Sequence, residues 1–457
     1  RAAELAVNEH FVVVSGGPGT GKTTIVTSIL AGLLKENIHR RVVLAAPTGK
    51  AAGRMQQAVH EQAKRRFADS AVGDKLLGLQ ASTIHRLLLT KQDDGSRPGP
   101  EAPLDCDVLV VDESSMVDMP LAMRLFDAID ESRTRVILLG DRHQLAAVGP
   151  GSVFADLSDA AGALAGNIEQ LTYSHRFASD KAIGTLAAAI NAADDKAVTE
   201  LLGSLTKDAG DVHEDNAVRW HRARDLSGQL TSQARDWVGS MMHAVIESIR
   251  ANEENFAAGG QKRLEAARSV ARTMRSFGAL AAVRRGPMSV EAINREADAI
   301  LCANGFEASR WRQIIVRSND DVLGLYNGDV GVVVPGEDAG DEVFFLDTER
   351  FVKLGLLPPF DPAFAITIHQ SQGSEYHHVA VFLPVDEDSP LAARELLYTA
   401  VTRVSDKRGT KASEKRFGTL DVFGSERVVK KSVKTRVMRE GGLAARLGQI
   451  RSSQQNN

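Results

Sequence analysis

The chain has 457 residues, and its 55 lysines and arginines against 59 aspartates and glutamates give a formal net charge of −4. Hydrophobic residues make up 43% and charged residues 25%, as in ordinary globular proteins, and no run approaches the roughly 18 apolar residues that cross a membrane. This length predicts two or three packed domains. The near-neutral charge excludes a general polycationic surface, so a nucleic-acid partner would be held by local patches, and we expect no membrane partner.

Cysteine usage and the start of the sequence bear on its compartment. Cys106 and Cys302 are too far apart for a CxxC metal or redox motif, and two thiols in a chain of this length are no disulfide framework. The sequence begins at Arg1 without a basic stretch followed by an apolar one, so it predicts no secretory signal. We therefore expect a cytoplasmic protein, and we expect the chain to be a fragment whose true N-terminus is missing.

Short apolar runs alternate with helical patterns over the first 165 residues. The runs that are apolar at nearly every position, which is typical of strands buried on both faces of a parallel sheet, lie at 11–15, 41–46, 108–112 and 135–141. Between the first two, apolar residues from Ile25 to Leu34 recur at the helical period. This region predicts an α/β domain with helices on both faces of its sheet, interrupted by a Pro- and Gly-rich surface excursion at 90–103.

The second half of the chain changes character twice. From about 180 to 301 the pattern is mostly helical, with an Ala-rich amphipathic helix expected over 261–282 and little sign of strands. Short strands at 313–317, 330–334 and 342–346, separated by Gly and Asp turns, then predict a small antiparallel barrel. A second α/β pattern follows, with a strand at 378–383 and a helix at 392–404.

A phosphate-binding motif lies between the first predicted strand and the helix after it. The segment matches GxxxxGK[ST] and comprises Gly16, Gly17, Pro18, Gly19, Thr20, Gly21, Lys22 and Thr23, with Thr24 following. Glycines let the backbone turn so that its N–H groups face phosphate oxygens, and the helix N-terminus favours negative charge. We expect Lys22 to bind the β- and γ-phosphates of ATP and Thr23 to bind Mg²⁺.

Acidic and polar residues end the next two predicted strands. Asp112 and Glu113 follow the run VLVV; after a P-loop, such a pair predicts a Mg²⁺ ligand and the base that activates the attacking water. Gln144 follows the strand ending at Asp141 and is suited to sense the γ-phosphate or to position water; the plainer interpretation, a helix cap by Asp141, can hold at the same time. Arg176 and Arg403 are candidate arginine fingers, although isolated arginines are more often surface ion pairs.

The order of the motifs is more specific than any one of them. GGPGTGKTT, LAAPTGKAAGRM, STIHRLL, VVDESSM, LLGDRHQLAAVGPGS, YSHRF, AITIHQSQGSE and ELLYTAVTRV follow one another as in superfamily 1 helicases. The chain resembles the RecD-type, 5′→3′ branch of that superfamily over nearly all its length. Within it, ALAAVRRGPMSVEAINREAD and LGLYNGDVG are most similar to the bacterial alpha subunit of exodeoxyribonuclease V, the RecBCD complex.

This resemblance implies two RecA-like P-loop lobes with an SH3-like barrel inserted in the second. The expected boundaries are 1–165 for the first lobe, 166–310 and 359–457 for the second, and 311–358 for the barrel, and the family's N-terminal partner-contacting domain is expected to be absent from this chain. The implied activity is an ATP-dependent, Mg²⁺-dependent helicase moving on single-stranded DNA and acting at duplex ends. RecB-like and RecC-like partners are also implied, in the recombinational repair of double-strand breaks. No nuclease site is evident in the sequence, so nuclease activity would belong to a partner.

The resemblance also assigns roles to residues outside the P-loop. His175 and Glu375 would lie at the nucleotide. The residues that match the family's strand-contacting motifs are Pro47, Thr48, Lys50, Thr83, His85, His369, Ser371, Gln372 and Gly373. Two positions depart from the family: His175 replaces a tyrosine, and Gln370 replaces a lysine.

Three alternatives remain open. The chain could be a free-standing RecD-like helicase, a P-loop ATPase acting on protein or as a kinase, or a structural subunit with a silent motor. A local excess of positive charge also lies between Asp406 and Arg451, where 13 Lys and Arg oppose 5 Asp and Glu. Such a run is usually a solvated face, so binding of DNA or a partner there is the less favoured interpretation.

Overall fold

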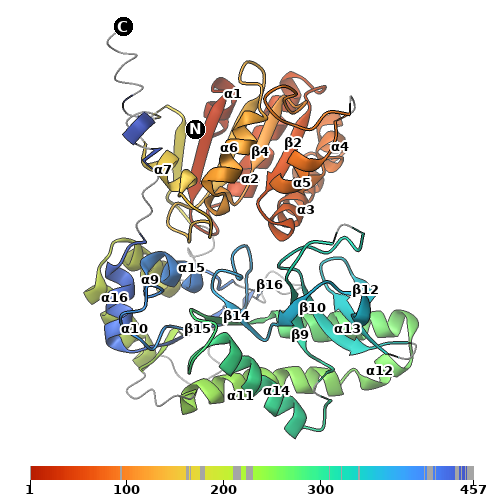
Figure 1. Cartoon of the computed structure of the whole chain (residues 1–457), viewed down its shortest axis with the longest axis vertical. Coiled ribbons are helices and arrows are strands. Elements are labelled where there is room, and N and C mark those ends of the chain that lie inside the picture. The colour runs from red at the N-terminus through yellow and green to blue at the C-terminus, as the bar shows by residue number, and fades with distance from the viewer. Residues whose placement is uncertain are drawn as a thin grey trace. The chain divides into compact units, whose positions relative to one another are not determined.

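A computed structural model describes most of the chain and divides it into two compact units (Figure 1). The described residues are 2–92, 95–160, 164, 166–174, 181–208, 218–222, 230–307, 309–320, 322–337, 340–405, 407–408, 415–416, 418–437, 442–443, 445–447 and 449. The first unit comprises Arg1–Ser179 together with Met438–Asn457, and the second comprises Asp180–Val437. Among the described residues, no helix is both long enough and apolar enough to cross a membrane.

The first unit is built on a six-stranded parallel sheet with the strand order β3-β2-β4-β5-β1-β6. Its strands are β1 (Phe11–Gly16), β2 (Val42–Ala46), β3 (Ala81–Thr83), β4 (Val108–Val111), β5 (Arg135–Gly140) and β6 (Ile168–Leu171). The four apolar runs predicted as strands are confirmed, because they form β1, β2, β4 and β5, and the central positions of each are buried. Residues that follow these strands therefore share one edge of the sheet.

Helices cover both faces of this sheet. The helices are α1 (Ala2–Asn8), α2 (Lys22–Glu36), α3 (Gly49–Arg66), α4 (Ala71–Leu77), α5 (Ile84–Leu89), α6 (Met119–Asp127) and α7 (Val153–Asp159), with a short 3₁₀ turn, η1 (Ser114–Met116). Alternate residues of β1 face opposite sides. Val12 and Val14 pack with α1 to α4 in one apolar core, while Val13 packs with α5, α6 and α7 in the other. The sheet is thus buried on both faces, as its sequence predicts.

The second unit contains a five-stranded parallel sheet with the order β14-β8-β15-β18-β7. Its strands are β7 (Val218–His221), β8 (Phe277–Ala281), β14 (Ala365–Thr367), β15 (His378–Phe382) and β18 (Thr419–Phe423). The prediction of a helix over 261–282 is wrong at its C-terminal end, because α13 (Gly260–Arg275) stops before β8. The fold class, α/β with parallel sheets, is confirmed in both units.

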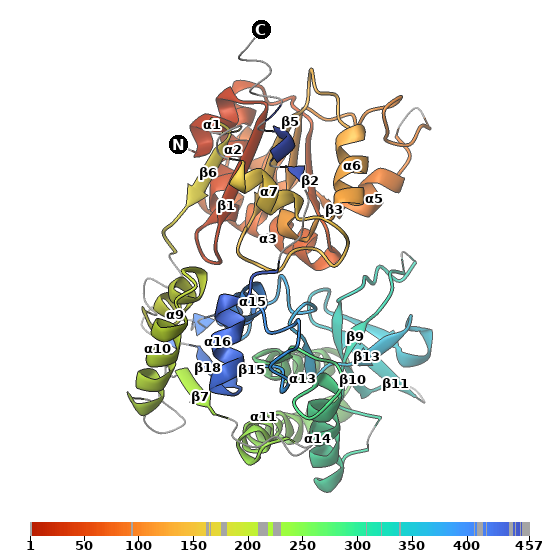
Figure 2. The same ribbon diagram turned by 60° about the vertical axis from the view of Figure 1, so that its left-hand side comes forward.

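The helices of the second unit pack on this sheet and on one another (Figure 2). They are α9 (Lys181–Asn191), α10 (Asp195–Asp208), α11 (Ser232–Arg250), α12 (Glu253–Ala257), α13, α14 (Val290–Ala303), α15 (Arg394–Val401) and α16 (Glu426–Lys434). A short hairpin of β16 (Lys407–Arg408) and β17 (Lys415–Arg416) precedes β18. Helices α9, α10 and α16 pack together, and α10 also contacts β7; α11, α13 and α14 enclose an apolar core with β8, β15 and β18.

An antiparallel sheet is inserted between β8 and β14. Its strands are β9 (Gln313–Val316), β10 (Val330–Pro335), β11 (Asp341–Phe345), β12 (Arg350–Lys353) and β13 (Phe360–Pro362), in the order β12-β11-β10-β9-β13, with the 3₁₀ turn η2 (Leu354–Leu356) after β12. The three strands predicted here are confirmed. Closure into a barrel is not, because the edge strands β12 and β13 do not pair with each other within the described residues.

Arginines join α13 to this antiparallel sheet. Arg263 is 4% exposed; its guanidinium donates to Glu342 at 2.6 Å and to the Pro335 carbonyl oxygen at 2.8 Å. The same guanidinium carbon lies 4.0 Å from the ring centre of Phe351. Farther along the helix, Arg268 donates to Glu349 at 2.7 Å. The sheet is therefore attached to the parallel-sheet core of its unit by charged contacts as well as by apolar packing.

The C-terminal tail differs from its predicted place in the second lobe, since Met438–Asn457 groups with the first unit. Leu443 and Leu447, which are one helical turn apart, pack against the apolar core that contains Val153 and Phe154. The chain thus passes from the first unit to the second and back again.

Candidate functional site

The P-loop joins β1 to α2 with two glycines in the left-handed region. Gly19 has φ 74° and Gly21 has φ 84°, conformations that side chains rarely adopt. Lys22 folds back over the loop, and its Nζ donates to the carbonyl oxygens of Gly16 at 2.6 Å and Gly17 at 3.2 Å. The Thr20 hydroxyl donates to the same Gly17 oxygen at 2.8 Å. The Lys22 ammonium and the Thr20 hydroxyl therefore both donate within the loop itself.

The carboxylates predicted for catalysis lie at the end of the neighbouring strand β4. The Glu113 N–H donates to Asp112 Oδ1 at 2.8 Å, and Glu113 itself has φ 50°, which turns the chain sharply into η1. Burial and the adjacent Glu113 carboxylate raise the pKa of Asp112 to about 6, and the nearby Lys22 ammonium opposes that rise. The structure thus brings Lys22 and Asp112 close enough to interact, as their motifs predict.

The donor set at this edge fits Mg²⁺ bound together with a nucleotide. Mg²⁺ binds oxygen ligands, keeps several waters, and is usually held by one or two protein groups plus phosphates. Asp112 offers a desolvated carboxylate at the end of β4, and Thr23 offers a hydroxyl in the first turn of α2. Among the described residues, no three His, Cys, Asp or Glu side chains form a metal-binding group. A metal held mainly by phosphate oxygens agrees with that sparse set.

Gln144 lies in the turn after β5, beside the same edge. Its side chain is 6% exposed, and its Nε2 donates to Asp141 Oδ2 at 3.3 Å. Asp141 also accepts from the His143 N–H at 3.0 Å. Asp141 therefore orders a turn, and the prediction that it caps a helix is wrong because no helix begins in this loop until Val153.

The candidate DNA-contacting residues of the first unit follow β2 and β3 at this edge. Thr48 caps α3 by accepting from the Ala51 N–H at 3.2 Å, and Thr83 caps α5 by accepting from the Arg86 N–H at 3.1 Å. Pro47 and Lys50 flank the first cap, and His85 is exposed on α5. Each threonine thus fixes a helix N-terminus, a structural role that holds alongside any contact with DNA.

In the second unit, residues 367–375 form a compact turn after β14. The Gln370 carboxamide oxygen accepts from the Thr367 N–H and hydroxyl, both at 3.0 Å, so this departure from the family orders the turn. The Ser371 hydroxyl donates to the Ile368 oxygen at 2.7 Å, and Gly373 has φ 69°. The other candidates on the turn are His369 and Glu375, which are partly exposed, and Gln372, which is buried.

Arg403 is buried in the second unit and is not a surface ion pair. The residue is 4% exposed; its Nε donates to the Thr399 carbonyl oxygen at 3.0 Å and its Nη1 to the Ser374 oxygen at 3.2 Å. It therefore ties the end of α15 to the turn that carries Ser371 to Glu375. The other predicted finger, Arg176, and the neighbouring His175 lie outside the described residues.

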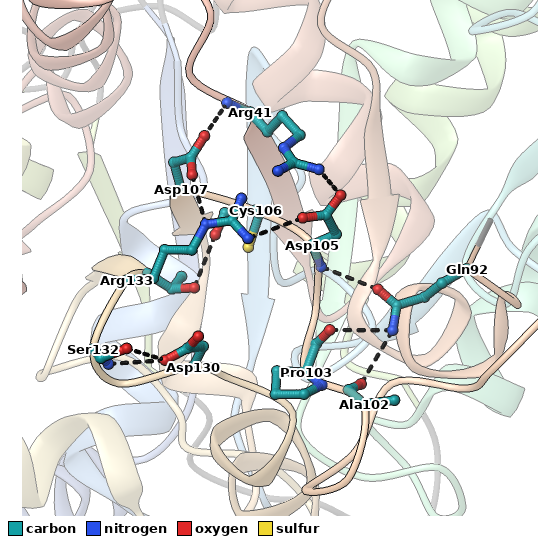
Figure 3. Close-up of polar contacts among 11 residues, drawn as sticks. Arg41, Gln92, Ala102, Pro103, Asp105, Cys106, Asp107, Asp130, Ser132 and Arg133 are labelled. Atoms are coloured by element: carbon teal, nitrogen blue, oxygen red, sulfur yellow. Dashed lines mark hydrogen bonds and ion pairs between the residues drawn. The ribbon is translucent and has the colours of Figure 1, made fainter. Parts of the chain in front are cut away.

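The opposite edge of the first sheet carries a charged cluster that the sequence does not reveal (Figure 3). Arg133 bonds Asp105 at 3.1 Å and Asp107 at 2.9 Å, while Arg41 pairs with Asp105 and donates its N–H to Asp107 at 2.7 Å. These residues precede β2, β4 and β5, so they lie at the amino ends of the strands. The cluster thus links the amino ends of three strands, opposite the edge that carries the P-loop.

Gln92 anchors the predicted excursion at that edge. Its amide donates to the Ala102 and Pro103 oxygens, each at 3.1 Å, and its Oε1 accepts from the Asp105 N–H at 3.0 Å (Figure 3). Beside it, burial raises the pKa of the Cys106 thiol to about 11. Burial therefore disfavours the thiolate, which is the reactive form of a cysteine.

Known proteins give a consistent picture of the chain. Residues 1–150 match the family model of an AAA domain, and residues 362–407 match that of a UvrD-like helicase C-terminal domain. The chain is 36% identical to the RecBCD enzyme subunit RecD of Mycolicibacterium smegmatis, covering 98% of this chain and 74% of that protein.

Two further comparisons are more distant. The ATP-dependent RecD2 DNA helicase of Deinococcus radiodurans is 28% identical over 87% of this chain and 46% of that protein. The crystal structure of Bacteroides Pif1 bound to single-stranded DNA is 15% identical, with a TM-score of 0.47 over 100% of this chain and 98% of that one. Given 36% identity over nearly the whole chain to a RecD subunit and a P-loop placed beside its carboxylates, the chain belongs to the RecD family of ATP-dependent DNA helicases.

Proposed function

We propose that the chain is the ATP-driven motor of a helicase–nuclease complex of the RecBCD kind and moves along single-stranded DNA in the 5′→3′ direction. The observation that carries the proposal is the shared sheet edge. Lys22 and Asp112 interact there. Thr48 and Thr83 lie at the carboxyl ends of β2 and β3, which are neighbouring strands of the same sheet. Ligands of open α/β sheets bind at this edge, so the same edge would bind both the nucleotide and the single-stranded DNA.

The proposed roles in hydrolysis follow the chemistry of each group. Lys22 exchanges its bonds to the loop carbonyl oxygens for bonds to the β- and γ-phosphates. Thr23 and Asp112 hold Mg²⁺, which neutralises charge on the phosphates when bound. Glu113 accepts the proton of the attacking water, and Gln144 contacts the γ-phosphate. Arg176 and Arg403 act as arginine fingers, a contribution worth about 10³ to 10⁵ in rate in other phosphoryl-transfer enzymes.

The remaining assignments concern ligand contacts and partners. His175 and Glu375 contact the nucleotide, and the strand is held by Pro47, Thr48, Lys50, Thr83, His85, His369, Ser371, Gln372 and Gly373. The antiparallel sheet β9–β13 takes the place of the family's inserted SH3-like barrel. RecB-like and RecC-like subunits are the proposed partners in a bacterial cytoplasm, because the M. smegmatis relative is a RecBCD subunit.

ATP turnover with and without single-stranded DNA tests the motor. We expect DNA to raise kcat, and Lys22→Gln to reduce turnover by a hundredfold or more, because the variant lacks the ammonium that faces the phosphates. Ser432→Ala, on α16 of the second unit, is the matched control and should turn over like wild type. Turnover indifferent to DNA would favour a P-loop ATPase with a protein substrate, and full activity of Lys22→Gln would refute the site.

Strand displacement tests direction and assembly. Duplexes with either a 5′ or a 3′ single-stranded tail are offered to the chain alone and to the chain reconstituted with RecB-like and RecC-like subunits. We expect unwinding of the 5′-tailed substrate, with exonuclease products only when the partners are present. Unwinding of the 3′-tailed substrate alone contradicts the direction, and efficient unwinding without partners favours a free-standing helicase.

A further inference from the structure

Two buried side chains beside the nucleotide edge carry polar atoms that have no hydrogen-bond partner among the described residues. Ser115, in η1, is 7% exposed, and Gln144 is 6% exposed. The unpartnered atoms are Ser115 Oγ and Gln144 Oε1. A buried hydroxyl or amide carbonyl without a partner destabilises the fold, and native structures contain few of them. Both atoms are therefore available to hydrogen-bond to each other or to a bound water or ligand.

The segments that carry these two atoms run side by side. The turn η1 contacts β5 and α7, the elements on either side of the Gln144 loop. Just beyond η1, the Met119 N–H donates to the Pro150 oxygen at 2.9 Å. Gly149 lies so close to Asp118 that any side chain at position 149 would collide with it. The segment after Glu113 and the loop after β5 are thus fixed against each other on both sides of the unpartnered atoms.

The hydrogen-bonding chemistry of the two atoms is complementary. The Gln144 amide nitrogen faces Asp141, and because an ionised carboxylate only accepts, this bond fixes which end of the carboxamide is oxygen. The other end of the carboxamide, Oε1, is a hydrogen-bond acceptor, whereas the Ser115 hydroxyl is a donor. Neighbouring Ser114 differs, since its hydroxyl already donates to the Val111 oxygen at 3.0 Å. Only the second serine after the catalytic carboxylates is available.

We propose that Ser115 is a positioning residue for Gln144. In the nucleotide-bound state its hydroxyl donates to Gln144 Oε1, directly or through one water, and holds the carboxamide between Ser115 and Asp141. The second hydrogen of the amide then faces the γ-phosphate. This link would couple the Glu113 segment to the Gln144 loop, so that both reach the phosphate together. The inference rests on the proposed function, because it assigns Gln144 to the γ-phosphate.

A double-mutant cycle on ATP turnover tests the link. We expect Ser115→Ala to lower kcat about tenfold, the effect of one lost hydrogen bond in the transition state, with nucleotide affinity within about twofold of wild type. Ser115→Thr keeps the hydroxyl and should recover most of the rate. In a Gln144→Ala background, Ser115→Ala should have no further effect. Wild-type turnover of Ser115→Ala, or losses that simply multiply in the double variant, would overturn the proposal.

Thermal unfolding separates this role from a purely structural one and does not depend on DNA. Without nucleotide, Ser115→Ala should melt at or above the wild-type temperature, because it removes a buried, unpartnered hydroxyl. With Mg²⁺, ADP and aluminium fluoride, which mimic the transferring phosphate, wild type and Ser115→Thr should gain more in Tm than Ser115→Ala. Equal gains overturn the link, even if the chain proves not to be a DNA motor.

Two serines serve as controls. Ser114→Ala removes the bond to the Val111 oxygen, so it should lower Tm in every nucleotide state and show no coupling to Gln144. Ser432 has a buried, unpartnered hydroxyl in α16 of the second unit, and Ser432→Ala should leave turnover and the nucleotide-dependent gain in Tm unchanged. Coupling of Ser114 to Gln144 equal to that of Ser115 would overturn the specific assignment.

Discussion

At the scale of single residues, the P-loop lysine is bonded within its own loop and interacts with Asp112. The motif spacing predicts which side chains face the phosphates, and the structure brings Lys22 and Asp112 together as expected. Spacing does not predict the bonds from Lys22 to the Gly16 and Gly17 oxygens, because the order of residues in a motif does not specify which hydrogen bonds their side chains make. For the same reason, the sequence gives no sign that Ser115 lacks a partner.

Asp112→Asn should stabilise the nucleotide-free protein at alkaline pH. The folded pKa of Asp112, about 6, lies above the ordinary value of 3.8, so the stability it contributes is complete below pH 3.8 and is lost as pH rises through 6. Above pH 6, removing the ionised carboxylate should raise the free energy of unfolding by on the order of 2 kcal/mol, less than the full shift implies because the side chain keeps some exposure.

The measurement is Tm at pH 4 and at pH 8 without nucleotide. The variant should exceed wild type at pH 8, and the difference should vanish near pH 4. Added Mg²⁺ and ATP should stabilise wild type and have less effect on Asp112→Asn. A variant less stable than wild type at pH 8 would contradict the cause assigned to the pKa shift.

Arg403→Ala should retain ATP binding but lose most hydrolysis. The residue also bonds the Thr399 and Ser374 oxygens, so its loss should destabilise the second unit by about 1–3 kcal/mol. Binding of a fluorescent ATP analogue, turnover and chemical denaturation are measured on the same samples. Arg403→Lys, which keeps the charge but not the fork of donors, should recover part of the stability and little of the rate. Loss of nucleotide binding in a folded Arg403→Ala would argue against the finger role.

At the scale of elements, the continuous apolar runs predict strands well, and the missed strand β8 shows where periodicity fails. The missed strand β8 reads FGALA, and it follows directly on the Ala-rich helix α13. Alanine and leucine suit a helix and a fully buried strand alike, so periodicity cannot mark the boundary between the two. Only the pairing of β8 with β14 and β15 distinguishes them, and those partners come later in the chain.

Arg263→Ala should loosen the antiparallel sheet from α13. It leaves the buried end of Glu342 without its partner, which typically costs about 3–5 kcal/mol in stability. Arg268→Ala is the matched control on the same helix; its partner Glu349 is 46% exposed, so that loss should be much smaller than the loss in Arg263→Ala. The stability of both variants is measured by urea denaturation and by hydrogen exchange of β10 and β11. Equal, small effects would show that apolar packing alone attaches the sheet.

At the scale of the whole molecule, the organisation into two α/β units agrees with the motif order. The motif order does not predict, however, that the chain returns to the first unit after the second. Sequence order predicts the tail in the second lobe, because the tail follows that lobe directly. The tail lies with the first unit because Leu443 and Leu447 pack there. These two leucines belong to a basic segment, and they could pack on any apolar surface. Long-range contacts of this kind leave no local pattern, so neither charge nor periodicity could predict them.

Replacing both Leu443 and Leu447 with alanine should destabilise the first unit selectively. Each side chain is only partly buried, so the combined loss should be about 2–4 kcal/mol, below that of two core leucines. Hydrogen exchange resolved by unit should show faster opening in β4 and β5 and unchanged protection in β15 and β18. Replacing the exposed Arg446 with alanine is the control. Equal destabilisation of both units would contradict the local role of the tail.

This route also sets an order of events during protein synthesis. The ribosome makes the strands of the first unit, then the whole second unit, and only afterwards the leucines that pack on the first apolar core. Domains generally fold as they emerge, so the nascent first unit presents an uncovered apolar patch throughout translation of the second. Packing of Leu443 and Leu447 is thus the step that covers this patch, and it can occur only after the whole second unit has been made.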